Sequence, residues 1–330
     1  MKPTRAGSHS IRMLVVLTLM ATPTSAQTLS GVAFQVDNDY FDFWMPSRDR
    51  PDDNYTHGQL LRTVFNTAPR WARGHIPSCS ELLNASATPK ICAQSFLTVS
   101  QEIFTPTNDA PMPISGERPY AGLLYADFGR SINDARQSRS LAIRVGTTGR
   151  ASGAQAAQMG FHRLTDQRQP KGWDYQVGTA PVIGVTYGRQ HLMTPGLVTR
   201  HSALQVIGSG GGTASYVQAK LNAGMEVRAG YGIPHPWIPA ADSGRRGFRA
   251  FVLLGGSESW VARDLLIEGN TKWTTGLVTK RPLVFESVWG LGAGFGSYAI
   301  EYRAVSRSRD YATGPSWHRW GRISIVHGNP

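Results

Sequence analysis

The sequence predicts an all-β fold: a 12-stranded antiparallel transmembrane β-barrel with one short helix in an outward-facing loop. Three observations predict it: long runs of alternating apolar and polar residues, an even number of such runs, and an N-terminal export segment. No run of 18 apolar residues occurs, so we expect no membrane-spanning helix. A membrane barrel hides its apolar surface in alternation, which is compatible with a chain only 41% hydrophobic.

Residues 1–26 have the three parts of a secretory signal peptide. The basic part holds Lys2, Arg5 and Arg12, the apolar part is Met13–Ala21, and Thr24–Ala26 supplies small residues for cleavage. A cytosolic amphipathic start is the alternative interpretation. We therefore divide the chain into a signal peptide, 1–26, and one barrel domain, 27–330. Cleavage removes three basic residues and lowers the formal charge from +12 to +9.

The clearest alternation runs from Ser215 to Gly230. Its apolar parity is Val217, Ala219, Leu221, Ala223, Met225, Val227 and Ala229, which we expect to face lipid. The other parity carries charged, amide and glycine residues, as a water-filled or packed lumen would. Such a run is long for a globular strand, usually about 5–6 residues, whereas a tilted membrane strand needs about 9–11.

Twelve candidate strands follow from this pattern. They lie near 29–38, 55–65, 95–104, 121–130, 139–148, 180–190, 200–208, 215–230, 246–260, 280–295, 296–307 and 317–327. A soluble sandwich or jelly roll also alternates, but strand length, export and the even count favour the bacterial outer membrane.

The loops between the strands differ in character. By strand order, 66–94 lies on the periplasmic side, and 39–54, 105–120 and 149–178 face outward. Within the last, 152–164 is expected to be helical, with Ser152 as its cap and an apolar stripe. Gln158 and His162 share another face of that helix, four residues apart.

Cys79 and Cys92 are the only two cysteines. In an exported protein this predicts a disulfide between them, inside the periplasmic segment. No CxxC or histidine pair accompanies them, which argues against metal binding there.

The positive charge is best explained by anionic lipid headgroups or lipopolysaccharide phosphates. Nucleic acid is not expected as a partner of an exported chain. We expect a monomer.

Three polar clusters should meet at the outward rim. They are Asp37–Tyr40 at the end of the first strand, Asn54–Gly58 at the start of the second, and the His162 helix with Gly172–Gln176. A carboxylate, an amide, a hydroxyl and an imidazole together suit ester hydrolysis. Taken singly, each also fits a solvated strand end or a structural histidine, and neither G-x-S-x-G nor H-E-x-x-H occurs.

Six motifs in order resemble the lipid A 3-O-deacylase family of outer-membrane barrels. They are V-D-N-D-Y at 36–40, N-Y-T-H-G at 54–58, Q-E-I-F-T-P at 101–106, R-P-Y-A-G at 118–122, Q-M-G-F-H-R-L at 158–164 and K-G-W-D-Y-Q at 171–176. Weaker similarity runs through 246–310, so the resemblance covers most of the mature chain.

The resemblance implies Ca²⁺-dependent hydrolysis of the 3-linked acyl ester of lipid A, at a site between the outer barrel wall and a loop helix. The family's catalytic positions fall on Asn38, Thr56 and His162, and its metal ligand on Asp39. On this hypothesis His162 is the general base, Asp39 holds calcium, and Asn38 and Thr56 position the water, ester or oxyanion.

Arg118 and Tyr120 also match a family motif and are expected to bind substrate. The family lysine expected near 108–111 is missing. A non-catalytic barrel that binds lipid, has a structural role or forms a channel therefore remains an alternative. A phospholipid esterase of the same architecture is the other alternative.

Overall fold

The computed structural model is a closed antiparallel barrel of twelve strands, as predicted. It describes residues 29–43, 54–65, 76–79, 91–194, 203–233, 235–237 and 247–328, so the expected signal peptide lies outside the described residues. Each strand pairs with its neighbours in sequence, and the first pairs with the last, from Gly31↔Gly328 to Asn38↔Gly321. Among the described helices, none has the length and apolar character to cross a membrane.

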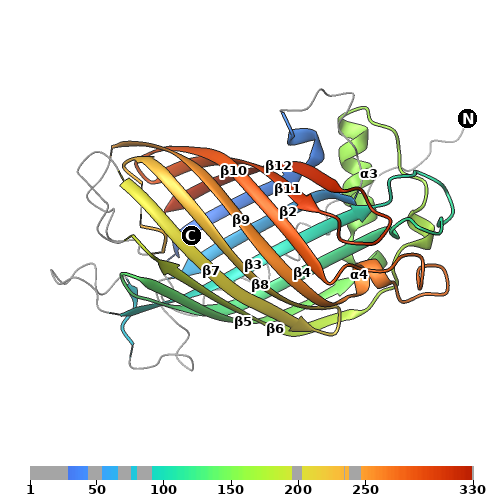
Figure 1. The fold of residues 1–330 in the computed structure, drawn as a ribbon, viewed down its shortest axis with the longest axis horizontal. Coiled ribbons are helices and arrows are strands. Elements are labelled where there is room, and N and C mark those ends of the chain that lie inside the picture. The colour runs from blue at the N-terminus through green and yellow to red at the C-terminus, as the bar shows by residue number, and fades with distance from the viewer. Residues whose placement is uncertain are drawn as a thin grey trace, which may run out of the picture.

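The strands lie close to their predicted positions (Figure 1). They are β1 (Leu29–Asn38), β2 (Asn54–Phe65), β3 (Cys92–Thr105), β4 (Ala121–Asn133), β5 (Gln137–Thr148), β6 (Pro181–Leu192), β7 (Ala203–Ser215), β8 (Gln218–Tyr231), β9 (Phe248–Asp264), β10 (Leu283–Phe295), β11 (Tyr298–Ser308) and β12 (Trp317–Gly328).

Apolar and polar side chains lie on the predicted faces of the barrel wall. The outward parity is apolar and exposed, with Leu221 58% and Leu291 49% exposed. The inward parity carries ion pairs: Arg322 donates two hydrogen bonds to Asp37, at 2.8 and 2.7 Å. Such pairs belong in the polar interior of a barrel wall whose outside faces lipid.

The largest difference from the predicted strand boundaries is in β7. β7 continues to Ser215, and a tight turn at residues 216–217 separates it from β8. Gly208 and Gly210–Gly212 lack side chains, so they hid the alternation in the second half of β7. Val217 therefore lies in the turn and is fully buried, not on the lipid face as expected.

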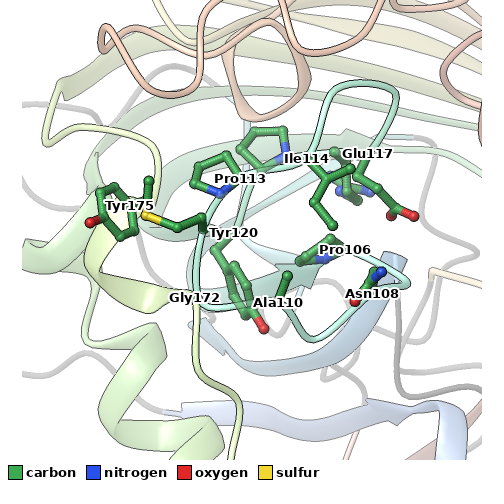
Figure 2. A pocket seen from close by; sticks show the side chains of 12 residues that line it. Pro106, Asn108, Ala110, Pro113, Ile114, Glu117, Tyr120, Gly172 and Tyr175 are labelled. Atoms are coloured by element: carbon green, nitrogen blue, oxygen red, sulfur yellow. The ribbon is translucent and has the colours of Figure 1, made fainter.

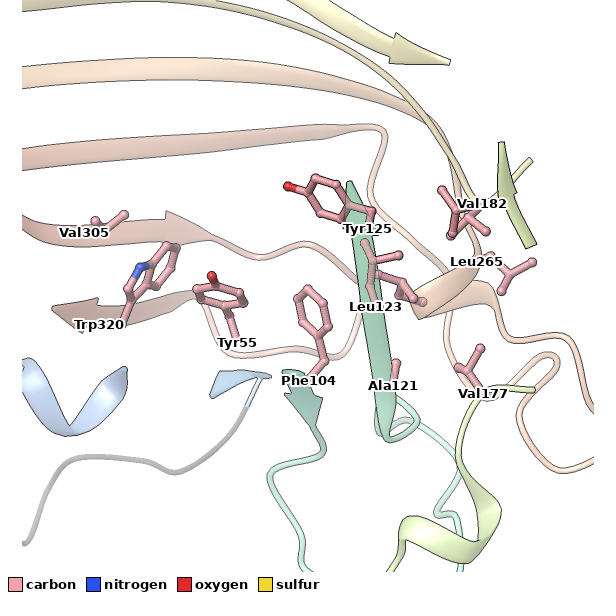
Figure 3. Packing of buried hydrophobic residues seen from close by; sticks show 12 residues of the cluster. Tyr55, Phe104, Ala121, Leu123, Tyr125, Val177, Val182, Leu265, Val305 and Trp320 are labelled. Atoms are coloured by element: carbon pink, nitrogen blue, oxygen red, sulfur yellow. The ribbon is translucent and has the colours of Figure 1, made fainter. Parts of the chain in front are cut away.

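An apolar cluster lies in the lumen at the barrel end where β1 ends. Figure 3 shows Tyr55 and Trp320 packing beside Phe104, and Leu123 beside Leu265. Leu265 belongs to the short helix α4 (Leu265–Glu268) that follows β9, and α4 brings Leu265 and Leu266 into this cluster. Side chains therefore occupy part of the lumen at this end, beside a cavity of about 200 Å³.

The opposite end of the barrel holds the cysteines. Cys79 and Cys92 form the predicted disulfide, and both are buried. Cys92 begins β3, a strand of 14 residues whose other end, Thr105, lies at the end that carries the outward loops. The disulfide is thus a full strand length from the predicted functional rim.

Helix α3 (Ala154–Leu164) stands outside the barrel wall at that rim (Figure 1). It begins two residues after the prediction, because the 3-10 helix η4 (Gly149–Ser152) precedes it. The N-cap of α3 is Gly153, so the predicted cap at Ser152 is wrong, although the Ser152 hydroxyl accepts a hydrogen bond from the Ala154 amide at 3.4 Å. Gln158 and His162 are both buried, as expected for residues on one covered face.

Candidate active site on the outer barrel wall

Asn38 lies on the outer wall at the end of β1. Strand alternation places it on the same face as the exposed Phe34, whereas Asp37 points inward to Arg322. Yet Asn38 is only 3% exposed, because the chain covers the wall at this rim. A polar side chain on the lipid-facing parity is costly unless it is hydrogen-bonded or functional.

A β-bulge in β2 turns two consecutive residues outward. The pairing of β2 with β3 shifts register between Tyr55 and His57. Tyr55 donates a hydrogen bond to the inward Asp37, and a Cβ on Gly58 would strike the Tyr55 ring, so Tyr55 and Gly58 both face inward. The two residues between them, Thr56 and His57, therefore share the outer face, as a bulge allows.

The bulge assembles a polar group around Asn38. Asn38 Nδ2 donates to the Thr56 carbonyl oxygen at 3.2 Å and lies 3.2 Å from His57 Nδ1. The Thr56 hydroxyl is 2.6 Å from that of Thr105, at the end of β3. Three adjacent strands thus hold the predicted Asn38 and Thr56 together, with His57 and Thr105 as further members.

The 3-10 helix η1 (Asp39–Phe41) folds over the outer face of β12. Asn38 Oδ1 caps it by accepting the Tyr40 amide at 2.8 Å. It passes directly over Gly321, where a Cβ would stand 2.5 Å from the Phe41 carbonyl carbon. The Tyr302 hydroxyl donates to the Phe41 carbonyl at 2.9 Å. This close approach buries Asp39 beside Asn38.

Side-chain contacts fasten α3 to the wall from the other side. Trp173 Nε1 donates to Gln158 Oε1 at 2.8 Å, and Gln101 Nε2 of β3 donates to the Ser152 carbonyl at 2.6 Å. Ile103, Tyr120, Ala154 and Trp173 form an apolar cluster beneath the helix. The Phe161 ring lies 5.8 Å from the His57 ring, so α3 reaches the polar group on β1 and β2.

The surroundings of His162 define its tautomer. Its Nδ1 lies 2.6 Å from the backbone carbonyl oxygen of Arg168, and the side chain is 2% exposed. A carbonyl only accepts hydrogen bonds, so Nδ1 carries the proton of the neutral ring. Nε2 then carries the lone pair that a general base needs.

Arg118 lies on the other side of the wall. Its guanidinium pairs with Asp310 at 3.4 Å, stacks 4.4 Å from the Phe104 ring, and lines a lumenal cavity of about 200 Å³. Arg118 is thus not brought to the polar group around Asn38. Tyr120 packs under α3 against Trp173 and donates to Asp109 at 3.1 Å.

The hollow formed by the 106–120 loop is too small for a lipid. Figure 2 shows Tyr120, Ala110 and Pro113 facing it, and its volume is about 10 Å³. A single water needs about 10–15 Å³ by the same kind of measure. This hollow is a packing gap, and the candidate site is the polar group on the outer wall.

Two carboxylates lie in the turn that follows β1. Asp39 and Asp42 are both buried, and in the described part of the chain no hydrogen-bond donor reaches Asp42 Oδ2. Calcium takes six to eight oxygen ligands, so carboxylates suit it. The described residues hold no group of three His, Cys, Asp or Glu side chains, so amide, backbone or substrate oxygens would have to complete a shell. The oxygen donors of this turn are of the kind that calcium binds.

Fold and site together define an outer-membrane β-barrel with a buried polar site on its lipid-facing wall. The model of the outer membrane protein LpxR family matches residues 12–328, and the chain belongs to that family, as its motifs indicated.

Among solved structures, LpxR from Salmonella typhimurium is similar with a TM-score of 0.71 and 17% identity, over 90% of this chain and 99% of that one. The β domain of the Bordetella autotransporter BrkA gives a TM-score of 0.43 and 9% identity, over 91% of this chain and 99% of that one. A search of curated proteins found no match.

Proposed function

We propose that this protein is a calcium-dependent esterase of the outer membrane that hydrolyses the 3-linked acyl chain of lipid A. The observation that carries the proposal is the buried His162 on the outer wall, whose Nδ1 lies 2.6 Å from a carbonyl oxygen, an arrangement that in the neutral ring leaves the lone pair on Nε2. A base in that position reaches an ester whose acyl chain stays in the lipid.

In the proposed reaction, His162 Nε2 takes a proton from water as the water oxygen bonds to the ester carbonyl carbon. The bond from that carbon to the 3-oxygen then breaks, and the imidazolium returns its proton to the 3-oxygen. The products are a fatty acid and a free 3-hydroxyl. The Arg168 carbonyl supports this cycle, because it binds Nδ1–H in both the neutral and the charged ring.

Asn38 and Thr56 are the groups proposed to orient the water, the ester or the oxyanion. The bulge fixes both on the outer face, and the Thr105 hydroxyl holds that of Thr56. Preorganised donors of this kind stabilise charge that develops at an ester oxygen. Calcium bound by Asp39, with Asp42 as a second oxygen donor, would polarise the ester carbonyl as a Lewis acid.

The position of the site favours a lipid esterase over a channel. The apolar cluster that contains Tyr55, Trp320 and Leu265 occupies the lumen at the same end of the barrel. A lipid substrate has no need of the lumen, because it approaches the outer wall laterally. The signal peptide, the +9 charge of the mature chain and the expected monomer are compatible with this function and are part of the proposal.

The test is mass spectrometry of purified lipid A after incubation with the purified protein, in Ca²⁺ and in excess chelator. The proposal expects loss of the 3-linked acyl group in Ca²⁺ and an intact substrate in chelator. A parallel incubation with phospholipid vesicles distinguishes a lipid A esterase from a phospholipid esterase. Fatty acid release only from the vesicles would assign a phospholipid substrate. Release from neither substrate would support the non-catalytic barrel.

A further inference from the structure

Asp109 joins two segments around the candidate base. It lies in the loop 106–120, between β3 and β4. Its Oδ1 accepts a hydrogen bond from the Tyr120 hydroxyl at 3.1 Å and another from the Lys171 amide at 2.9 Å. Its Oδ2 lies 3.3 Å from Arg168 Nε. One carboxylate therefore links the loop 106–120, through its last residue Tyr120, to the segment that follows α3.

The segment that Asp109 holds is the one that binds His162. After α3 ends, the chain reverses at Asp166, which has a left-handed backbone with φ of 54°. The Gln167 amide donates to the His162 carbonyl at 2.8 Å, and the Arg168 carbonyl then meets His162 Nδ1 at 2.6 Å. Arg168 thus contacts His162 through its backbone and Asp109 through its side chain.

We propose that Asp109 is a positioning residue for His162, a role that rests on the proposed function of His162 as the base. Asp109 fixes the 168–171 segment against the barrel, and this places the Arg168 carbonyl where it holds the proton on Nδ1. Without that anchor the ring exchanges between its two tautomers and orientations. The fraction of enzyme with a basic Nε2 falls accordingly.

The two bonds to Oδ1 carry more of this anchor than the ion pair. The Arg168 side chain is 72% exposed, and exposed ion pairs contribute little. The hydrogen bond from the Tyr120 hydroxyl is partly buried, so water replaces it less readily than it replaces the exposed ion pair, and the Lys171 amide binds the same oxygen. Asp109→Asn keeps an oxygen acceptor, whereas Asp109→Ala removes every contact.

The experiment compares purified Asp109→Ala, Asp109→Asn and wild type in two assays. The first is deacylation of lipid A, and the second is ¹⁵N NMR of histidine-labelled protein, with the His162 signals assigned by their loss in His162→Gln. The matched control is Asp174→Ala, because Asp174 lies in the outward loop that carries His162, is 80% exposed and pairs with the exposed side chain of Arg150.

In wild type we expect a single His162 tautomer with the proton on Nδ1. Asp109→Ala should average the two nitrogens and lower kcat by about 10- to 10²-fold, with KM changed less than about threefold. Asp109→Asn should retain the wild-type tautomer and most of kcat, and the Asp174→Ala control should match wild type. Folding is checked by heat-modifiable migration, and Asp109→Ser replaces Asp109→Ala if the latter does not assemble.

An Asp109→Ala protein that keeps the wild-type tautomer and kcat would overturn the proposal. An equal loss of kcat in Asp174→Ala would also overturn it, because the effect would then belong to the loop as a whole. If wild type has no deacylase activity but Asp109→Ala still changes the tautomer, the proposed function fails and the positioning of His162 by Asp109 stands.

Discussion

Replacing Gly321 with alanine should inactivate the site without unfolding the barrel. Gly321 of β12 carries η1 across the outer wall, and a Cβ there would lie 2.5 Å from the Phe41 carbonyl carbon, closer still to its oxygen. Ordinary van der Waals contact begins at 3.4 Å, so η1 has to move outward by about 1 Å. Backbone atoms on both sides of the contact leave no flexible side chain to absorb the clash.

The displacement would reach Asp39 and Asn38, because both belong to the same turn. It also stretches the 2.9 Å hydrogen bond from Tyr302 to the Phe41 carbonyl. A shift of about 1 Å in a positioning element costs about 10²-fold in rate, so we expect a loss of that size. The stretched bond contributes only about 1 kcal/mol to stability, which the strand pairing of a barrel tolerates.

The assay is the initial rate of lipid A deacylation by mass spectrometry, with heat-modifiable migration as the check of folding. Gly210→Ala is the matched control, because it adds the same methyl group to a barrel strand where the nearest atom is 3.7 Å away. Activity of Gly321→Ala within about threefold of wild type would refute the reasoning that η1 needs a residue without a Cβ beneath it.

Three further predictions concern the wall, the disulfide and the metal. Leu221→Arg on the lipid face should lower the free energy of unfolding by about 2–4 kcal/mol in urea titrations, and the lumenal Asn222→Arg should cost less; equal losses would contradict the assigned faces. A protein with both Cys79 and Cys92 replaced by Ser should lose at most about 3 kcal/mol of stability and keep its deacylase rate, whereas a large rate loss would contradict the separation of the two ends. Asp39→Ala and Asp42→Asn should each weaken Ca²⁺ binding at least about tenfold in isothermal titration calorimetry, against Asp174→Asn as a control; unchanged binding in Asp42→Asn would remove Asp42 from the site.

The barrel was predictable because lipid outside and polar groups inside impose a period of two on nearly every strand. Where that signal weakens, the prediction fails. The glycines of β7 have no side chains to alternate, so the sequence predicts too short a strand and puts Val217 on the wrong surface. The disulfide followed from export and the presence of only two cysteines.

The site was predictable only in part. Alternation from Phe34 placed Asn38 on the outer wall, and strand pairing placed Thr56 near it. The bulge that turns both Thr56 and His57 outward leaves no mark in the alternation of so short a segment. The role of Asp109 depends on a loop contact across about sixty residues, which no local pattern reveals. Arg118 was expected at the site from a motif, which does not indicate on which side of the wall a side chain lies.

The central claim is that His162 on the outer wall is the base of an ester hydrolase. The most direct test is the rate of lipid A deacylation by folded His162→Ala protein, measured by mass spectrometry in saturating Ca²⁺. The account predicts a rate at least about 10²-fold below wild type, the lower range for a lost general base. A variant that deacylates lipid A at the wild-type rate would contradict it and would move the search for the base to His57.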